Sequence, residues 1–506
     1  MEYFNTHLLS LILFIPAISA VIMLFLPNEV KLQRWFAFVA SLIPFVLTLV
    51  LWNKFDPNAT GFQFQEKYIW YEAIHSSFHI GVDGISFSMV LLTTLLTPLA
   101  ILASFSVTDR VKPYMMLFLF LETGMLGVFM ALDLLIFFVF WEIGLVPMYF
   151  LINQWGSANR DYASLKFMIY TMGGSLGLLL AVQMLGVLFG TYDLVSLYQQ
   201  WNSLTADTIL MGMTVGTVKT IAFWAFAIAF AVKVPLWPFH TWLPDAHTEA
   251  PTAGSMILAG VLLKLGAYGF IRLVLPLYPV EAKLFAGALA VLAVGAIVFG
   301  AFGSFGQTDF KRLVAYSSVN HMGFVVLGIA AAGLAAGTAD AHIAMSGAVL
   351  QMFNHGLSAA GMFFLVGVIY ERTHTRNLDE FGGLFPLVPI YGGILIFTSM
   401  ASLGLPGLNG FVSEFMIVRG SYQPLTIYTA ISMLGLLFTG AYILKGIKKV
   451  LHGPMNEHWA HGEHKLTEIN LREILVMVPL MALMLFTGIW PMWILNIINK
   501  AVTALF

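Results

Sequence analysis

The sequence predicts an all-α integral membrane protein with about fourteen transmembrane helices. Hydrophobic residues make up 59% of its 506 residues and charged residues only 10%, whereas a soluble domain carries about 25% charged residues. The apolar residues stand in runs long enough to cross a bilayer, which takes about 20 residues in a helix. The runs are continuous and do not alternate with polar residues, which argues against a transmembrane barrel.

These runs follow one another along the whole chain. The first lacks a basic segment before it and a small-residue cleavage site, so we expect a retained helix and not a signal peptide. The fourth and fifth runs nearly touch at Asp133, which makes their division the weakest. The predicted spans are 8–26, 34–52, 85–107, 114–132, 134–152, 165–189, 212–243, 254–275, 284–303, 313–335, 343–370, 386–420, 425–447 and 474–496.

Two of the runs contain helix-breaking sequences, at 231–238 and at 402–410. Because proline has no N–H, the carbonyls of Ala231 and Val234 lose their helical partners and could hold water. Paired interrupted helices suggest inverted repeats of five helices each, with a transport site between them. The expected divisions are an N-terminal three-helix segment (1–107), a first five-helix repeat (114–275), a second five-helix repeat (284–447), and a cytoplasmic loop with the last helix (448–506).

Lys and Arg are distributed unequally between the connections. With fourteen spans, the odd-numbered connections carry fifteen basic residues, and the even-numbered connections and the tail carry seven. Cytoplasmic loops are enriched in Lys and Arg. The bias therefore places both termini outside.

Four ionisable residues lie deep inside apolar runs: Glu142, Lys233, Lys264 and Glu414. A charged residue at a helix centre costs roughly 2.5–3.5 kcal/mol on insertion scales, so such residues face the bundle interior and usually have a function. An opposite charge stabilises a buried ammonium, so a Glu–Lys pair that opens and closes would switch the proton affinity of the Lys. A static ion pair that holds helices together is the alternative.

Histidines add further candidates for proton transfer. His321 and His355 lie in apolar runs, and an imidazole can pass a proton between its two nitrogens. A hydrogen-bonded packing histidine is an equally good interpretation. A second group, His240, Asp245, His247 and Glu249, stands where the seventh span ends. It could feed protons inward, but a solvated helix end explains it at least as well.

Several function classes are excluded or disfavoured. The chain has no cysteine, so it holds no thiolate-bound iron–sulfur cluster or Cys-ligated zinc. We find no glycine-rich dinucleotide motif and no Walker sequence. A net charge of −2 gives no basic surface for nucleic acid. We therefore expect no cofactor and no metal, and any redox chemistry must take place on another chain.

Four stretches together resemble the M-subunit family of bacterial NADH:quinone oxidoreductase, respiratory complex I, which is similar to subunit 4 of the mitochondrial enzyme. The resemblance covers nearly the whole chain. The 233–252 stretch is specific to the wider antiporter-like superfamily, whereas Glu142, Glu414 and the length indicate the M branch. The stretches are FWEIGLVPMYF (140–150), KVPLWPFHTWLPDAHTEAPT (233–252), NHMG (320–323) and HGLSAA (355–360).

The resemblance implies roles for the candidate residues. Glu142 and Lys233 match the family's ion pair, Lys264 its linking lysine, and Glu414 the terminal residue of a half-channel. His321 and His355 match its central polar positions. It also implies proton translocation driven by quinone reduction elsewhere, in a hetero-oligomer with L-type and N-type neighbours in the bacterial inner membrane, with periplasmic termini.

Three alternatives stay open at this point. The chain could belong to a multisubunit Na⁺/H⁺ antiporter or a membrane-bound hydrogenase, or to a photosynthetic relative that uses ferredoxin. It could also be a structural spacer that conducts nothing, although a spacer would not need four ionisable residues at membrane depth. The L-type sister would add a long lateral helix after the last span, which we do not expect here. Gene neighbours would separate most of these alternatives.

Overall fold

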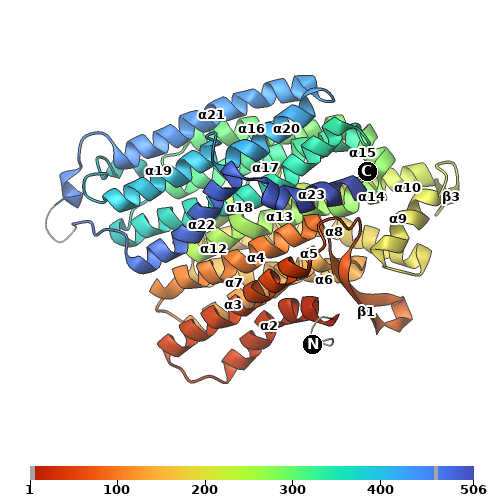
Figure 1. The fold of residues 1–506 in the computed structure, drawn as a ribbon, viewed down its shortest axis with the longest axis horizontal. Coiled ribbons are helices and arrows are strands. Elements are labelled where there is room, and N and C mark those ends of the chain that lie inside the picture. The colour runs from red at the N-terminus through yellow and green to blue at the C-terminus, as the bar shows by residue number, and fades with distance from the viewer. Residues whose placement is uncertain (1–5, 461–464, 506) are drawn as a thin grey trace.

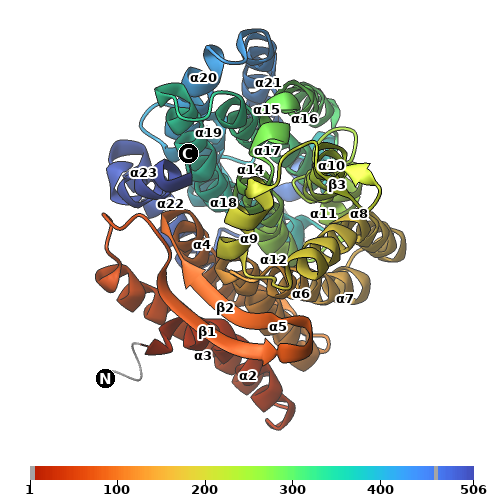
Figure 2. The same cartoon turned by 90° about the vertical axis from the view of Figure 1, so that its right-hand side faces the viewer.

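A computed structural model describes residues 6–460 and 465–505 of the chain. The long helices lie side by side in one bundle (Figure 1). One end of the bundle carries two β-hairpins, the start of α2 and the end of α23, as Figure 2 shows, and we call it the hairpin end. The opposite end holds the connections 104–110, 156–159, 307–309 and 374–388, and we call it the basic end after the Lys and Arg residues that flank it.

Most predicted spans contain one long helix each. Among the described residues, twelve helical segments are long and apolar enough to cross a membrane. α2 (Leu8–Leu24) and α19 (Pro389–Leu403) are shorter, with 17 and 15 residues, so the total of fourteen stays a prediction. The other long helices are α3 (Val30–Lys54), α4 (Gly84–Ala103), α5 (Val111–Met130), α8 (Arg160–Phe189), α10 (Val215–Lys233), α16 (Ala286–Gly306), α17 (Phe310–Leu334), α18 (Ala339–Thr373), α21 (Thr426–Leu451) and α22 (Leu471–Ile489).

Polar side chains fix where several of these helices begin. Asp83 accepts hydrogen bonds from the first-turn amides of α4 and forms a capping box with Ser86. The side chains of Asp133, Asp309 and Thr338 also accept hydrogen bonds from first-turn amides of the helices that follow them. Such caps satisfy N–H groups that have no partner within the helix. They therefore end the connecting loops at defined residues.

Both predicted helix breaks are confirmed. α10 ends at Lys233, and eight residues separate it from α11 (Trp242–Glu249). α19 ends at Leu403, and α20 (Asn409–Tyr422) continues toward the hairpin end. A milder interruption divides the fifth span at Gly144 into α6 (Leu134–Ile143) and α7 (Leu145–Trp155). Glu142, Lys233 and Glu414 each lie next to one of these three interruptions.

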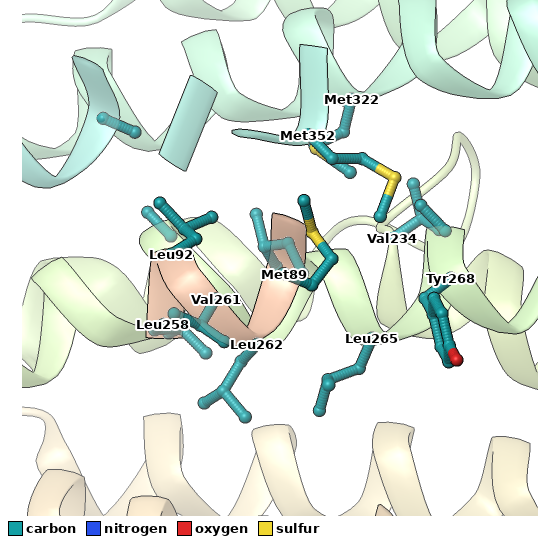
Figure 3. Packing of buried hydrophobic residues seen from close by; sticks show 14 of the residues in the cluster. Met89, Leu92, Val234, Leu258, Val261, Leu262, Leu265, Tyr268, Met322 and Met352 are labelled. Carbon is teal, nitrogen blue, oxygen red and sulfur yellow. The ribbon is translucent and has the colours of Figure 1, made fainter. Parts of the chain in front are cut away.

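The centre of the bundle is formed by two wholly buried spans. One is α18. The other alternates α-helical and π-helical segments: α12 (Thr252–Ile257), η3 (Leu258–Leu262), α13 (Leu263–Gly269), η4 (Phe270–Val274) and α14 (Leu275–Leu277). Figure 3 shows Met89 and Leu92 of α4 and Met322 and Met352 packed around this second span.

The hairpin end contains structure that the apolar runs do not predict. β1 (Gln63–Tyr71) and β2 (Ser76–Val82) form an antiparallel hairpin, and β3 (Ile209–Leu210) pairs with β4 (Met213–Thr214). The short helix α9 (Leu194–Ser203) lies beside them (Figure 2). Backbone hydrogen bonds of Leu132 and Leu194 join β2, the start of α6 and α9. The remaining short elements are α15 (Pro279–Leu284), η1 (Glu72–Ile74), η2 (Ser104–Ser106), η5 (Leu378–Glu380) and η6 (Glu457–Trp459).

The last predicted span, 474–496, is wrong in its extent. α22 ends at Ile489, and the chain turns at Trp490 and Pro491 into a separate helix, α23 (Met492–Leu505). α23 packs on α4 and α18. A Cβ on Gly84 would lie 1.9 Å from the carbonyl oxygen of Ile497. The close approach of α23 to the start of α4 therefore requires glycine at that position.

Candidate functional site

Glu142 and Lys233 lie at the ends of two helices that both pack on α8. Lys233 is 1% exposed, and its Nζ has no hydrogen-bond partner among the described residues. Glu142 is half-buried, with Oε1 buried and also without a partner there. The two groups interact electrostatically, but no ion pair joins them in the described chain. Instead, Lys233 Nζ lies 5.2 Å from the centre of the Trp141 ring, a cation–π geometry.

The broken backbone beside Lys233 is partly satisfied by the protein. The Ala231 carbonyl accepts a hydrogen bond from the Leu236 amide at 2.7 Å, so the protein itself supplies one partner, and its second lone pair can still accept from water. The Val232 carbonyl accepts one from the Trp242 indole at 2.8 Å. The Trp242 bond holds the start of α11 against the end of α10.

Lys264 lies in α13 between the two π-helical segments and is wholly buried. π-Helical turns are rare and often mark functional sites. The Lys264 ammonium donates to the Ala259 carbonyl of η3, and its Nζ lies 2.7 Å from His355 Nδ1 of α18. His355 Nε2 is buried without a partner in the described chain. Lys264 and His355 are therefore in direct contact across the two central spans.

The contacts continue from His355 to Glu414. The rings of His355 and His321 lie with centres 5.6 Å apart. His321 Nδ1 lies 2.8 Å from Glu414 Oε1, and His321 Nε2 lies 3.3 Å from the Tyr442 hydroxyl. The Gln351 amide also donates to Glu414 Oε1, at 3.1 Å. Lys264, His355, His321 and Glu414 thus form one line of side chains from α13 through α18 and α17 to α20, which we call the central chain.

The structure brings four of the six predicted site residues into the central chain and places Glu142 and Lys233 as a separate pair. Each member of the central chain can hold or release a proton, and each is 4% exposed or less. A line of such groups can pass protons when each one in turn changes its partner. Leu262 and Leu265, which belong to the same span as Lys264, are buried apolar residues (Figure 3).

His247 also lies in this region, and the sequence left open whether its group feeds protons inward or forms a solvated helix end. The side chain is wholly buried, and both ring nitrogens are without a partner among the described residues. Its ring stacks on Phe363 at 4.2 Å and 8°. Lys311 and Lys264 both interact electrostatically with His247. His247 in turn interacts electrostatically with His355. One signal was present in the sequence, since Leu243, Ala246 and Ala250 share its helical face and are buried too.

The other members of the predicted group at 240–249 do not gather around His247. Asp245 pairs with Lys166 at 2.7 Å and with Arg312 at 3.1 Å. Glu249 accepts a hydrogen bond from the Asn159 amide at 3.0 Å. The part of the chain that the structure describes contains no group of three or more His, Asp or Glu side chains arranged to hold a metal ion.

The comparisons with known proteins agree on one family. The family model described as NADH:quinone oxidoreductase/Mrp antiporter, transmembrane, matches residues 131–439. NADH-quinone oxidoreductase subunit M of Rhodobacter capsulatus is 40% identical over 99% of this chain and 96% of its own length. NADH-ubiquinone oxidoreductase chain 4 of Marchantia polymorpha is 37% identical over 99% of this chain and 97% of its own.

Solved structures agree with this assignment. A chain of respiratory complex I from Thermus thermophilus superposes with a TM-score of 0.84 and 26% identity, covering 98% of this chain and 99% of that one. A chain of the Mrp complex from Dietzia has the same fold, with a TM-score of 0.82 at 18% identity. The chain therefore belongs to the NADH:quinone oxidoreductase/Mrp antiporter family of membrane subunits, among the relatives named subunit M.

Proposed function

We propose that this chain is a proton-translocating subunit in the membrane arm of an NADH:quinone oxidoreductase. Protons move through two half-channels joined by buried Glu, Lys and His residues, and redox chemistry on other subunits drives them. The central chain carries the proposal, because Lys264, His355, His321 and Glu414 connect both halves of the sequence inside the bundle. A spacer would have no need for such a line of costly buried groups.

In this account each residue has a defined role. Glu142 sets the proton affinity of Lys233 by approaching or leaving it, since a nearby carboxylate stabilises the ammonium. Lys264 exchanges a proton with His355, whose Nδ1 it contacts. His321 then links His355 to Glu414, which holds the proton before release. No electron passes through these groups.

The setting of the subunit follows from its relatives and its loop charges. We propose a hetero-oligomer with L-type and N-type neighbours in the bacterial inner membrane. The basic end faces the cytoplasm and both termini face the periplasm, in keeping with the excess of Lys and Arg on one set of connections. The units 114–275 and 284–447 act as the two half-channels, each with one broken helix.

A single substitution in the central chain tests the proposal. Lys264→Met keeps the length of the side chain and removes the titratable nitrogen. Proton uptake by inverted membrane vesicles supplied with NADH and quinone should fall by roughly a factor of ten or more, since a positioned proton-transfer group contributes on the order of 10²–10⁴ in rate. Native gels must show that the complex assembles. Lys283→Met, which changes an exposed lysine, is the control, and normal uptake by assembled Lys264→Met would refute the proposal.

A further inference from the structure

A cavity of about 180 Å³ opens at the basic end, between α4, α5, α12, α17 and α18. A buried water needs only about 10–15 Å³ of such space, so the cavity has room for several. Four charged side chains line it: Glu249, Lys311, Glu371 and Arg376. Glu371 is exposed, whereas Lys311 and Glu249 are buried. The cavity thus extends from the exposed Glu371 to buried side chains inside the bundle.

Lys311 lies on the buried side of the cavity, in the first turn of α17. It donates to the Ala250 carbonyl where α11 meets α12. The neighbouring Arg376 already pairs with Asp309 at 3.2 Å and donates to the Thr248 carbonyl. Among the described residues Lys311 forms no ion pair of its own. It is therefore a buried amine beside water-sized space, without a carboxylate in direct contact to hold its proton.

His247 is the buried titratable group that both this amine and Lys264 influence electrostatically. It lies on α11 three residues before Ala250, and both its nitrogens are buried without partners in the described ranges. Lys311 and Lys264 are the two cations that act on it. His247 is therefore within electrostatic range of both Lys311 and Lys264, and Lys264 contacts His355 directly.

We propose that Lys311 takes up protons from water in this cavity and passes them through His247 to Lys264. An excess proton of the cavity water adds to the neutral Lys311 amine. The ammonium then loses one N–H proton to a His247 nitrogen through water, and the amine becomes neutral again. No electron is transferred. This inlet rests on the proposed function, because it supplies the central chain.

The competing role for Lys311 is structural. Lys311 and Arg376 both hold carbonyls at the end of α11, and a cation that never loses its proton would serve equally well there. The two roles differ in one property. An inlet must release its proton, which an arginine does not do in proteins.

The test uses the assembled complex in inverted vesicles, with NADH-driven proton uptake and quinone reduction as readouts. Lys311→Arg should assemble yet lower uptake by roughly a factor of ten or more. Arg312→Gln is the matched control, because Arg312 is the next residue, carries the same charge and pairs with Asp245 outside the cavity. It should leave uptake unchanged. Full uptake by Lys311→Arg would overturn the inlet.

A second variant keeps the test decisive if arginine does not fit. The chain has no cysteine, so Lys311→Cys introduces a thiol that bromoethylamine converts to a lysine analogue with a titratable amine. Uptake should be low before the reaction and recover several-fold afterwards, relative to equally treated complex without the cysteine. Failure to recover would overturn the inlet.

The Lys264→Met variant separates failure of the inlet from failure of the proposed function. If Lys264→Met abolishes uptake while the Lys311 variants are normal, only the inlet fails. If Lys264→Met is also normal, the proposed function fails.

Discussion

Glu142 and Lys233 each keep a buried polar atom without a hydrogen-bond partner in the described chain. A static ion pair in apolar surroundings would bring the two charges into direct contact, because an unpaired buried charge is costly. Here they interact from a distance, and Lys233 lies over the Trp141 ring. The geometry therefore differs from that of a closed, static ion pair.

This view of the pair predicts how Glu142 responds to substitution. Glu142→Gln removes the charge and should abolish most proton uptake while assembly, judged by native gel, is retained. Glu142→Asp keeps the charge with a shorter reach and should retain a good part of the uptake. Normal uptake by assembled Glu142→Gln would mean that the carboxylate only holds helices together.

The six candidate residues stand out in the sequence because each interrupts an apolar run, and that signal is local. His247 was named only as one member of a polar group, because Asp245, Thr248 and Glu249 surround it in the sequence, whereas its ring packs on Phe363 of α18. Lys311 fell in the connection between the predicted spans 284–303 and 313–335 for a similar reason. Its neighbours Asp309 and Arg312 are polar, and the backbone that covers it belongs to α11.

At the scale of elements, the helix breaks could be predicted because nearby residues cause them. The β1–β2 hairpin could not, because its position depends on residues far away in the sequence. The breaks at 234–241 and 404–408 follow from prolines in the same segment. The β1–β2 hairpin has no long apolar run, and its place depends on distant partners, among them Asp133 and Asp193. Asp193 accepts hydrogen bonds from His79 of β2 at 2.9 Å and from Lys67 of β1 at 2.7 Å.

Asp193 is predicted to hold the hairpin to the bundle. Asp193→Asn should weaken the contact by about 1.5–3 kcal/mol, the usual worth of hydrogen bonds to a charged group. Hydrogen exchange of β1 and β2 in the purified complex should then be roughly ten- to a hundredfold faster. Asp340→Asn is the control at the same end, since its ion pair with Arg419 is more exposed. Unchanged exchange in Asp193→Asn would contradict this role.

The same residue predicts a pH dependence. Burial raises the pKa of Asp193, but hydrogen bonds from His79 and Lys67 outweigh it and hold the pKa well below its usual value. A carboxylate with a lowered folded-state pKa stabilises above its unfolded pKa of about 3.9, and that stabilisation is lost as the pH falls toward the folded value. The difference in exchange between wild type and Asp193→Asn should therefore be constant from about pH 5 to 8 and shrink only below about pH 4.

At the scale of the whole molecule, the bundle has two different ends, and their sidedness can be measured. Asn58 is exposed at the hairpin end and His458 at the basic end. In this cysteine-free chain, Asn58→Cys should react with an impermeant maleimide in intact spheroplasts. His458→Cys should react only after the membrane is opened. Labelling of the second but not the first from outside would reverse the proposed orientation.

The central claim is that buried amines of this subunit gain and lose protons during turnover, and Lys233→Arg tests it most directly. Arginine keeps the positive charge and the contact with Trp141 but does not deprotonate in proteins. The measurement is NADH-driven proton uptake together with quinone reductase rate in vesicles, with subunit content checked by native gel. The account predicts that assembled Lys233→Arg loses uptake and slows quinone reduction, as Lys233→Ala does. Full activity of the arginine variant would show that Lys233 never releases its proton and would contradict the relay.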